Sequence, residues 1–161
     1  MDEVIYFGSP LGSIEVSGSD QGITTVHFAD KEEEETTEIK SAVLLECKQQ
    51  LLEYFNGKRN WFSVKLNPIG TDFQKDVWDC LVQIPFGKTS TYSKIAETLG
   101  DINSVRAVGS SNAKNPIALI IPCHRVIGKS GDLVGYAGGL HRKEWLLKHE
   151  GVIHHSQLNL F

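Results

Sequence analysis

The chain has 161 residues, of which 40% are hydrophobic and 22% are charged. This balance is typical of one or two folded domains and excludes a disordered or collagen-like chain. No apolar run approaches the roughly 20 residues of a membrane span, and the acidic, turn-rich first ten residues are not expected to be a secretory signal. The cysteines are widely spaced and form no CxxC pair, which favours free thiols and a cytoplasmic location.

Charge is distributed unevenly along the chain, whose formal net charge is −4. Residues 1–70 hold 12 acidic and 6 basic side chains, whereas residues 102–151 hold 3 acidic and 7 basic ones. Six of the acidic residues lie between Asp30 and Glu38, where a solvated loop or a helix start is expected. The negative total therefore does not exclude an anionic partner for the C-terminal part.

The N-terminal part is predicted to be a small sheet with a helix. Three β-rich runs separated by Gly-containing turns predict a β meander over residues 4–28. Apolar residues recur every four positions over residues 38–55 and predict a helix, and alternation over residues 61–66 predicts another strand. A break containing Pro and Gly follows, which divides the chain into predicted domains 1–68 and 69–161.

The second domain is predicted to be mainly helical. Thr71 and Gln74 form a capping box that begins its first helix. Short helices over residues 93–99 and 105–113, joined by a GDIN turn, resemble a helix-turn-helix. The remaining predicted elements are an apolar run and a last helix, over residues 117–127 and 143–150.

The segment Pro122-Cys123-His124-Arg125 carries the clearest chemical signal. A cysteine in an apolar run is normally an inert small hydrophobe, which is the interpretation for Cys47 and Cys80. Cys123 differs because a proline precedes it and two basic residues follow, and cationic neighbours lower a thiol pKa. These residues leave two alternatives open for Cys123, a reactive nucleophile or a buried structural thiol.

His124 is the obvious base for Cys123, but adjacent residues of an extended strand point to opposite faces. Contact between them therefore requires a bend, which Pro122 makes plausible, or a water molecule. The imidazole also needs an acceptor, and Glu144 and Glu150 of the last helix are the candidates. The histidines near the C-terminus fit no zinc spacing, so no metal is predicted.

The sequence strongly resembles the O6-alkylguanine-DNA alkyltransferase family in several motifs that follow one another at the family's spacing. The most specific are IPCHRV at residues 121–126 and GYAGGLHRKEWLLKHEG at residues 135–151. The resemblance covers residues 71–151, whereas residues 1–68 match the family only in their length and in their order of strands followed by a helix. Its other motifs are Phe73-x-x-x-Val77-Trp78, Ile84-Pro85-Phe86-Gly87-Lys88-Thr89, Tyr92-Ser93, Ile95-Ala96, Arg106-Ala107-Val108-Gly109 and Asn115-Pro116.

The resemblance implies that Cys123 accepts the alkyl group from O6-alkylguanine, and from O4-alkylthymine, irreversibly and once per molecule. His124 would deprotonate Cys123 through a water molecule, and Glu150 would orient His124. Tyr92 would protonate the leaving base, and Asn115 would brace the turn before the cysteine loop. The implied pocket residues are Val126, Tyr136, Ala137 and Gly138.

The resemblance also implies that the protein flips the damaged base out of double-stranded DNA. Arg106 would fill the gap in the base stack, and the helix that carries Ala107 and Ser110 would lie in the minor groove. Ser93 and Lys129 are the implied phosphate contacts. From the residues alone, the short or cationic side chains of this helix are expected on one side, namely Arg106, Ser110, Ser111 and Asn112. The alternative is a helical hairpin that only packs against the core.

The implied architecture is α+β, with a small ribonuclease H-like N-terminal domain and a winged-helix-like C-terminal domain. A monomer is expected, without a cofactor, a metal, a membrane or an obligate protein partner. Ala118 and Ala137 replace the proline and serine of some relatives, which predicts tolerance of larger alkyl groups. The alternative functions are a non-catalytic protein that binds alkylguanine lesions, a cysteine hydrolase and a sequence-specific regulator.

Overall fold

The computed structural model of the chain describes residues 2–152, which divide into two compact units. The N-terminal unit comprises the chain up to Ile69 together with Pro116–Ile120. The C-terminal unit comprises Gly70–Asn115 and the chain from Ile121 onward. His154 and His155, two of the C-terminal histidines that fit no zinc spacing, lie outside the described residues.

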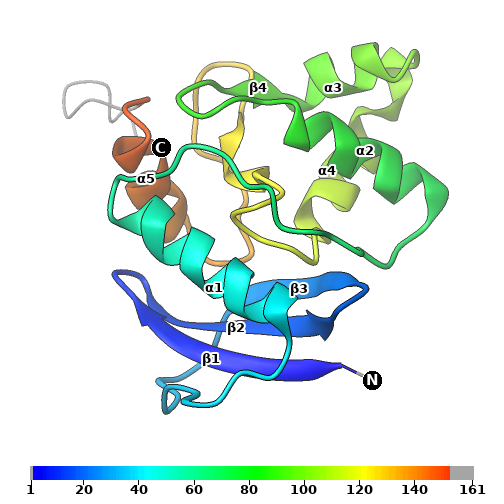
Figure 1. Cartoon of the computed structure of the whole chain (residues 1–161). Coiled ribbons are helices and arrows are strands. Elements are labelled where there is room, and N and C mark those ends of the chain that lie inside the picture. The colour runs from blue at the N-terminus through cyan, green and yellow to red at the C-terminus, as the bar shows by residue number, and fades with distance from the viewer. Residues whose placement is uncertain (1, 153–161) are drawn as a thin grey trace. The chain divides into compact units, whose positions relative to one another are not determined.

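The N-terminal unit is an antiparallel three-stranded sheet with one helix. The strands follow one another in the order β1 (Glu3–Ser9), β2 (Gly12–Ser19) and β3 (Gly22–Phe28). Figure 1 shows α1 (Ala42–Phe55) lying along one face of this sheet. The apolar side chains that alternate along the strands, among them Ile5, Phe7, Ile14 and Val16, are buried on that face.

The start of α1 is set by its capping contacts and not by the apolar periodicity. The helix was predicted from residue 38, but it begins at Ala42, with Ser41 as N-cap. Ser41 Oγ accepts the Leu44 N–H, and the Glu3 carboxylate accepts the N–H groups of Lys40 and Ser41. Residues 31–41 form neither helix nor strand. This agrees with the loop, which was one of the two alternatives expected for the acidic segment.

The strand predicted over residues 61–66 is wrong. The backbone N–H groups of Ser63 and Val64 donate to the side-chain oxygen of Gln50 on α1, so they are not available to a strand partner. Only Leu66 forms a bridge, to Ile23 of β3. Gln50 is buried, and its side-chain amide takes the place of the neighbouring strand that the alternating pattern predicted as the hydrogen-bond partner.

Residues 116–120 pack with the N-terminal unit, although the sequence placed them in the second domain. The Val26 N–H of β3 donates to Pro116 O, and the Ala118 N–H donates back to Val26 O. Ile117 and Leu119 are buried in this unit. Leu119 takes a positive φ of 74°, a conformation that is costly for a residue other than glycine and that reverses the chain locally.

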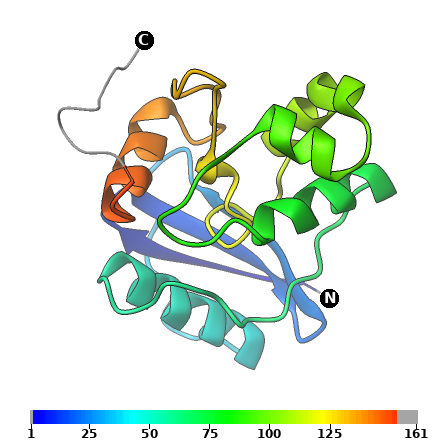
Figure 2. The same ribbon diagram turned by 90° about the horizontal axis from the view of Figure 1, so that it is seen from above.

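The C-terminal unit is mainly helical. Its elements are α2 (Asp72–Val82), β4 (Ser90–Thr91), α3 (Tyr92–Thr98), the 3-10 turn η1 (Ile102–Ser104), α4 (Val105–Ala113), the 3-10 turn η2 (Cys123–Arg125), β5 (Val126–Ile127) and α5 (Leu140–His149). Figure 2 shows α4 beside α2 and α3, against which it packs. The predicted capping box of α2 is present, because Thr71 and Gln74 exchange hydrogen bonds of 3.0 and 3.1 Å.

Two features of this unit were not predicted. A parallel pairing of β4 with β5 ties the start of α3 to the residues that follow Cys123. The last helix begins at Leu140, after Gly139 with a φ of 96°, and ends at His149, so that Glu150 is its C-cap residue. Within residues 2–152, no helix combines the length and the apolar character needed to cross a membrane.

Candidate active site

Cys123 begins a 3-10 turn and does not lie in a strand. Pro122 is the N-cap of η2, and the Arg125 N–H donates to Pro122 O at 2.9 Å. Cys123, His124 and Arg125 are all buried. The turn supplies the bend that the adjacent Cys–His pair requires, because successive side chains of a 3-10 turn do not point to opposite faces.

His124 forms a hydrogen bond with Glu150. Its Nε2 lies 2.8 Å from Glu150 Oε2, and both side chains are fully buried. Of the two candidate acceptors, Glu144 instead pairs with Lys148 one turn along α5. Because the ionised Glu150 carboxylate can only accept, Nε2 carries the proton and Nδ1 keeps a lone pair. Nδ1 is buried and has no hydrogen-bond partner among the described residues.

Arg125 points to Glu150 and not to Cys123. Its Nε and Nη2 donate to the two carboxylate oxygens at 2.7 and 3.0 Å, and its Nη1 donates to Ile84 O at 2.6 Å. Burial alone would raise the pKa of Glu150, but hydrogen bonds from His124 and Arg125 lower it to about 2. Burial lowers the pKa of His124 and the Glu150 contact opposes this, which leaves a neutral imidazole at neutral pH.

Glu150 makes the stability of this unit sensitive to acid. Its pKa of about 2 lies below the ordinary 4.5, so between these values the unfolded chain binds more protons than the folded one. The stabilisation is complete above pH 4.5 and is lost as the pH falls toward 2, by an amount of about 3 kcal/mol.

We therefore expect urea titrations to show a free energy of unfolding that falls steeply between about pH 5 and pH 2.5. In the Glu150→Gln variant, whose stability is lower throughout, this component of the fall should be missing. The same steepness in both proteins would contradict the assignment.

The surroundings of Cys123 raise the pKa of its thiol, although basic residues follow it in the sequence. Burial raises the pKa of this thiol, whereas the Asn115 side chain and the Lys143 ammonium group oppose the rise. The two basic residues do not offset this rise, because the Arg125 guanidinium pairs with Glu150 and the His124 imidazole is neutral. The resting thiol is protonated, so its reaction needs a base.

Lys143 is a buried cation that the sequence analysis missed. Its Nζ donates to three carbonyl oxygens, those of Val126 at 2.6 Å, Val134 at 2.5 Å and Gly135 at 3.3 Å. Burial lowers the pKa of Lys143 to about 8, and the interaction with Cys123 acts in the opposite direction. Lys143 thus links α5 to the loop after the cysteine and supplies positive charge near the sulfur atom.

Tyr92 and Asn115 both lie near Cys123. Tyr92 is the first residue of α3, and its phenol is close enough to Cys123 for the two to interact electrostatically. Asn115 Nδ2 donates to Ile121 O at 2.7 Å, which fixes the turn two residues before the cysteine. The structure therefore brings together all five of the predicted catalytic side chains within one unit.

The predicted pocket residues lie in or next to the two segments whose carbonyl oxygens accept hydrogen bonds from Lys143. Val126 is fully buried in β5, and the Tyr136 hydroxyl is buried without a hydrogen-bond partner among the described residues. Burial raises the pKa of Tyr136 well above its usual value, and Cys123 adds to the rise. Ala137 is exposed and Gly138 is half-buried, and Gly138 O accepts a hydrogen bond from Arg142.

The predicted DNA-contacting residues lie at the surface of the C-terminal unit. Arg106, Ala107 and Ser110 form an exposed face of α4, Lys129 is exposed, and Ser93 is half-buried at the start of α3. Ser111 and Asn112 were expected on the same side of α4 as Arg106, but both are buried. Helical spacing explains the correction, because they lie beside Val108 on the core face.

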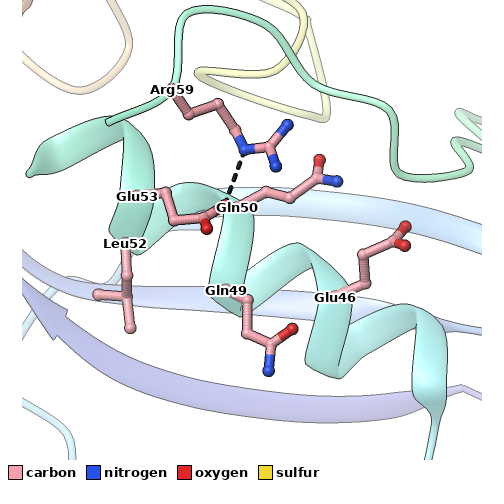
Figure 3. A pocket seen from close by; sticks show the side chains of 6 residues that line it. All are labelled: Glu46, Gln49, Gln50, Leu52, Glu53 and Arg59. Carbon is pink, nitrogen blue, oxygen red and sulfur yellow. Dashed lines mark hydrogen bonds and ion pairs between the residues drawn. The ribbon is translucent and has the colours of Figure 1, made fainter. Parts of the chain in front are cut away.

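The N-terminal unit has a surface hollow of its own. Figure 3 shows a surface hollow on the N-terminal unit, with an ion pair of 2.9 Å between Arg59 and Glu53, and it holds none of the predicted site residues. Its lining residues are Glu46, Gln49, Gln50, Leu52, Glu53 and Arg59. Within residues 2–152, no group of three or more His, Cys, Asp or Glu side chains is placed to hold a metal ion.

Comparison with known proteins gives two matches that together span almost the whole chain. Residues 72–152 match the DNA binding domain of 6-O-methylguanine DNA methyltransferase, and residues 4–68 match its ribonuclease-like domain. The chain belongs to the 6-O-methylguanine DNA methyltransferase family. The family, the α+β fold and the methyltransferase activity predicted from the sequence are confirmed.

Individual members of the 6-O-methylguanine DNA methyltransferase family match the chain over most of its length. A methylated-DNA–protein-cysteine methyltransferase of Methanosarcina acetivorans is 47% identical over 149 residues, which are 90% of this chain and 96% of the relative. The crystal structure of Mycobacterium tuberculosis O6-methylguanine methyltransferase is 39% identical, covers 93% of each chain and has a TM-score of 0.83. A crystal structure of Mycobacterium tuberculosis OGT in complex with DNA is 40% identical, covers 90% of each chain and has a TM-score of 0.81.

Proposed function

We propose that this protein repairs O6-alkylguanine in double-stranded DNA by transferring the alkyl group to Sγ of its own Cys123, once per molecule. The observation that carries the proposal is the buried arrangement of Cys123, His124 and Glu150. Glu150 holds the proton of His124 on Nε2, which leaves Nδ1 with a lone pair that can act as a base. We also propose that it acts as a monomer, because all the side chains involved belong to one unit of one chain.

In the proposed reaction, His124 Nδ1 takes the proton of Cys123 through a water molecule. The thiolate attacks the alkyl carbon, the bond between carbon and O6 breaks, and its electron pair goes to the guanine. Tyr92 gives its phenol proton to the departing base. The products are a thioether, an imidazolium, a phenolate and guanine, so atoms and charges balance. Because the thioether is stable and no second step frees the cysteine, the protein reacts once.

Duplex DNA as the partner is supported by the charge and the shape of the C-terminal unit. Residues 102–151 carry a net positive charge, which favours phosphate contacts. The exposed face of α4 carries the small side chains Ala107 and Ser110, which allow a close approach to a DNA backbone. Mycobacterium tuberculosis OGT, 40% identical to this chain, has been crystallised in complex with DNA.

The fate of the lesion tests the proposed function. A duplex with one O6-methylguanine is incubated with excess protein, and the DNA is digested to nucleosides for chromatography. The proposal predicts that O6-methylguanine is replaced by guanine. A lesion-binding protein would retain the duplex and leave O6-methylguanine intact. In a second incubation with the duplex in excess, a hydrolase would continue to react beyond one equivalent of protein.

Arg106 is expected to act only when the base must leave a duplex. The O6 atom is unreachable within the base stack, and extrusion of the base costs a few kcal/mol that an inserted side chain offsets. We expect Arg106→Ala to slow transfer from duplex DNA about 10-fold to 100-fold and to leave transfer from free O6-benzylguanine unchanged. Lys114→Ala, an exposed cation at the end of the same helix, is the matched control. Equal slowing with both substrates would contradict this role.

The alkylated protein is expected to be less stable than the unreacted one. Cys123 is buried in a packed turn, so an added methyl group overpacks it, at a cost of about 1–3 kcal/mol. This corresponds to a melting temperature that is lower by roughly 2–10 °C. Calorimetry before and after reaction with the lesion duplex, with the DNA removed, measures it. An unchanged or higher melting temperature would refute the expectation.

A further inference from the structure

The ammonium group of Lys143 connects two backbone segments that a loop separates along the chain. Its Nζ donates to Val126 O at 2.6 Å before the loop, and to Val134 O at 2.5 Å and Gly135 O at 3.3 Å after it. The Lys143 side chain is fully buried. A lysine is almost never fully buried without specific partners, and the proposed reaction gives this one no role.

Each of the two connected segments carries part of the candidate active site. Val126 follows directly on η2, the turn that begins with Cys123. Gly135 directly precedes Tyr136, the first residue of the predicted pocket run 136–138. The Gly139 N–H donates to Tyr136 O at 2.9 Å, so this run turns back toward the start of α5. The Lys143 contacts therefore join the cysteine turn (residues 123–126) to the pocket segment (residues 134–138).

Other backbone hydrogen bonds do not make this connection. The loop between the two segments is closed within itself, where the Gly128 N–H donates to Asp132 O at 2.7 Å. Residues 126 and 127 form β5, whose strand partner is β4. Within residues 2–152, no backbone hydrogen bond runs directly from residues 126–127 to residues 134–135. The direct hydrogen-bonded connection is therefore supplied by the Lys143 side chain.

Lys143 can make this connection because it is a cation with three N–H groups. Burial lowers its pKa to about 8, which still leaves it mostly protonated at neutral pH. An ammonium group has three donors and no acceptor, which matches the three carbonyl oxygens around it. Methionine has a side chain of similar length but no donor. Lys143→Met should therefore keep the packing of the stem and release the two segments from each other.

We propose that Lys143 is a positioning residue, whose ammonium group holds the pocket segment against the cysteine turn so that a bound base is presented to Cys123 Sγ. This inference rests on the proposed function, in which that base carries the alkyl group. Lys143 takes no part in the bond that breaks or in the bond that forms. Its effect on transfer passes through the backbone of the two segments.

Two reactions of Cys123 test this role in Lys143→Met. Methyl transfer from a lesion duplex needs the assembled pocket, whereas iodoacetamide alkylates the same sulfur atom without it. The Lys143 charge opposes the rise in the Cys123 pKa, so its loss slows both reactions. We expect the second-order rate constant of methyl transfer to fall about 10-fold further than that of iodoacetamide, because the base is no longer aligned with the sulfur atom.

Peptide mapping restricts the iodoacetamide measurement to Cys123, since Cys47 and Cys80 are also free thiols. Lys148→Met is the matched control, because it removes a cation from the same helix where that cation forms a surface pair with Glu144. The ratio of its two rate constants should be that of the wild type.

Chemical rescue provides a readout that a packing role would not change. Lys143→Ala removes the atoms of n-propylammonium, which can be added back as a free ion. We expect n-propylammonium to restore most of the ratio between methyl transfer and iodoacetamide alkylation, because it returns the N–H donors to the carbonyl oxygens. Tetramethylammonium carries the same charge without an N–H group and should leave the ratio low.

The outcomes separate this inference from the proposed function. If the wild-type protein transfers no methyl group, the proposed function fails and the inference fails with it. If the wild type reacts but both rate constants of Lys143→Met fall equally, or neither falls, only the positioning role is overturned. A lack of rescue by n-propylammonium, or equal rescue by tetramethylammonium, also overturns it. Melting curves check both variants. If one of them does not fold, the other decides alone, and if neither folds, Lys143 serves folding and the positioning role is overturned.

Discussion

Replacing Cys123 with serine is expected to abolish alkyl transfer, with a loss of at least about 10⁴-fold in the single-turnover rate constant. Serine keeps the size and the burial of the side chain, so the turn should fold as before. It lacks the thiolate, which is the species that attacks an alkyl carbon. The variant should still bind duplex DNA that contains the lesion.

Cys80 provides the matched control for this experiment. It is half-buried on α2, and burial raises its pKa, so it resembles Cys123 in residue type but is placed in no reaction step. Cys80→Ser should transfer the alkyl group at the wild-type rate. Transfer by Cys123→Ser, or its loss in Cys80→Ser, would show that the acceptor has been assigned to the wrong cysteine.

Replacing Glu150 with glutamine is expected to have the largest effect on stability. The substitution leaves the buried Arg125 guanidinium without a counter-charge, and breaking a buried ion pair in this way costs about 3–5 kcal/mol. His124 also loses the carboxylate that keeps its proton on Nε2, so we expect transfer to slow by about 100-fold. Urea titration and single-turnover kinetics at low temperature measure the two effects.

Two further variants separate charge from packing. Glu144→Gln removes a carboxylate from the same helix, where it forms a surface pair with Lys148, and should cost less than about 0.5 kcal/mol. Adding Arg125→Met to Glu150→Gln removes the unpaired charge and should restore part of the lost stability. If Glu150→Gln were as stable as Glu144→Gln, the buried ion pair would not contribute as described.

Local signals in the sequence were sufficient for much of the fold. The meander of β1–β3 follows from alternating apolar residues and turn residues, and α2 follows from a capping box whose partners are three positions apart. The strand expected over residues 61–66 could not be excluded in this way. Its backbone partner is the side chain of Gln50, and no local pattern reveals that contact.

The adjacent residues drew attention to Cys123, and the family resemblance assigned it as the nucleophile, whereas its electrostatics could not be predicted from the sequence. Arg125 follows Cys123 by two residues, yet its side chain is directed to Glu150, 25 positions away. In the sequence, Lys143 is indistinguishable from an exposed charged residue of a helix. Its burial depends on the three carbonyl oxygens that accept hydrogen bonds from its Nζ, and the sequence does not reveal these contacts. Asn112 was placed on the wrong face of α4 because its small polar neighbours suggested one continuous exposed stripe.

The mass of the intact protein after reaction with a duplex that carries one O6-methylguanine tests the central claim most directly. With the lesion in excess, the account predicts a gain of one methyl group per chain and no more. Peptide mapping should place that group on the peptide that contains Cys123. An unchanged mass, a second methyl group, or a modification on another peptide would contradict transfer to Cys123 as the function of this protein.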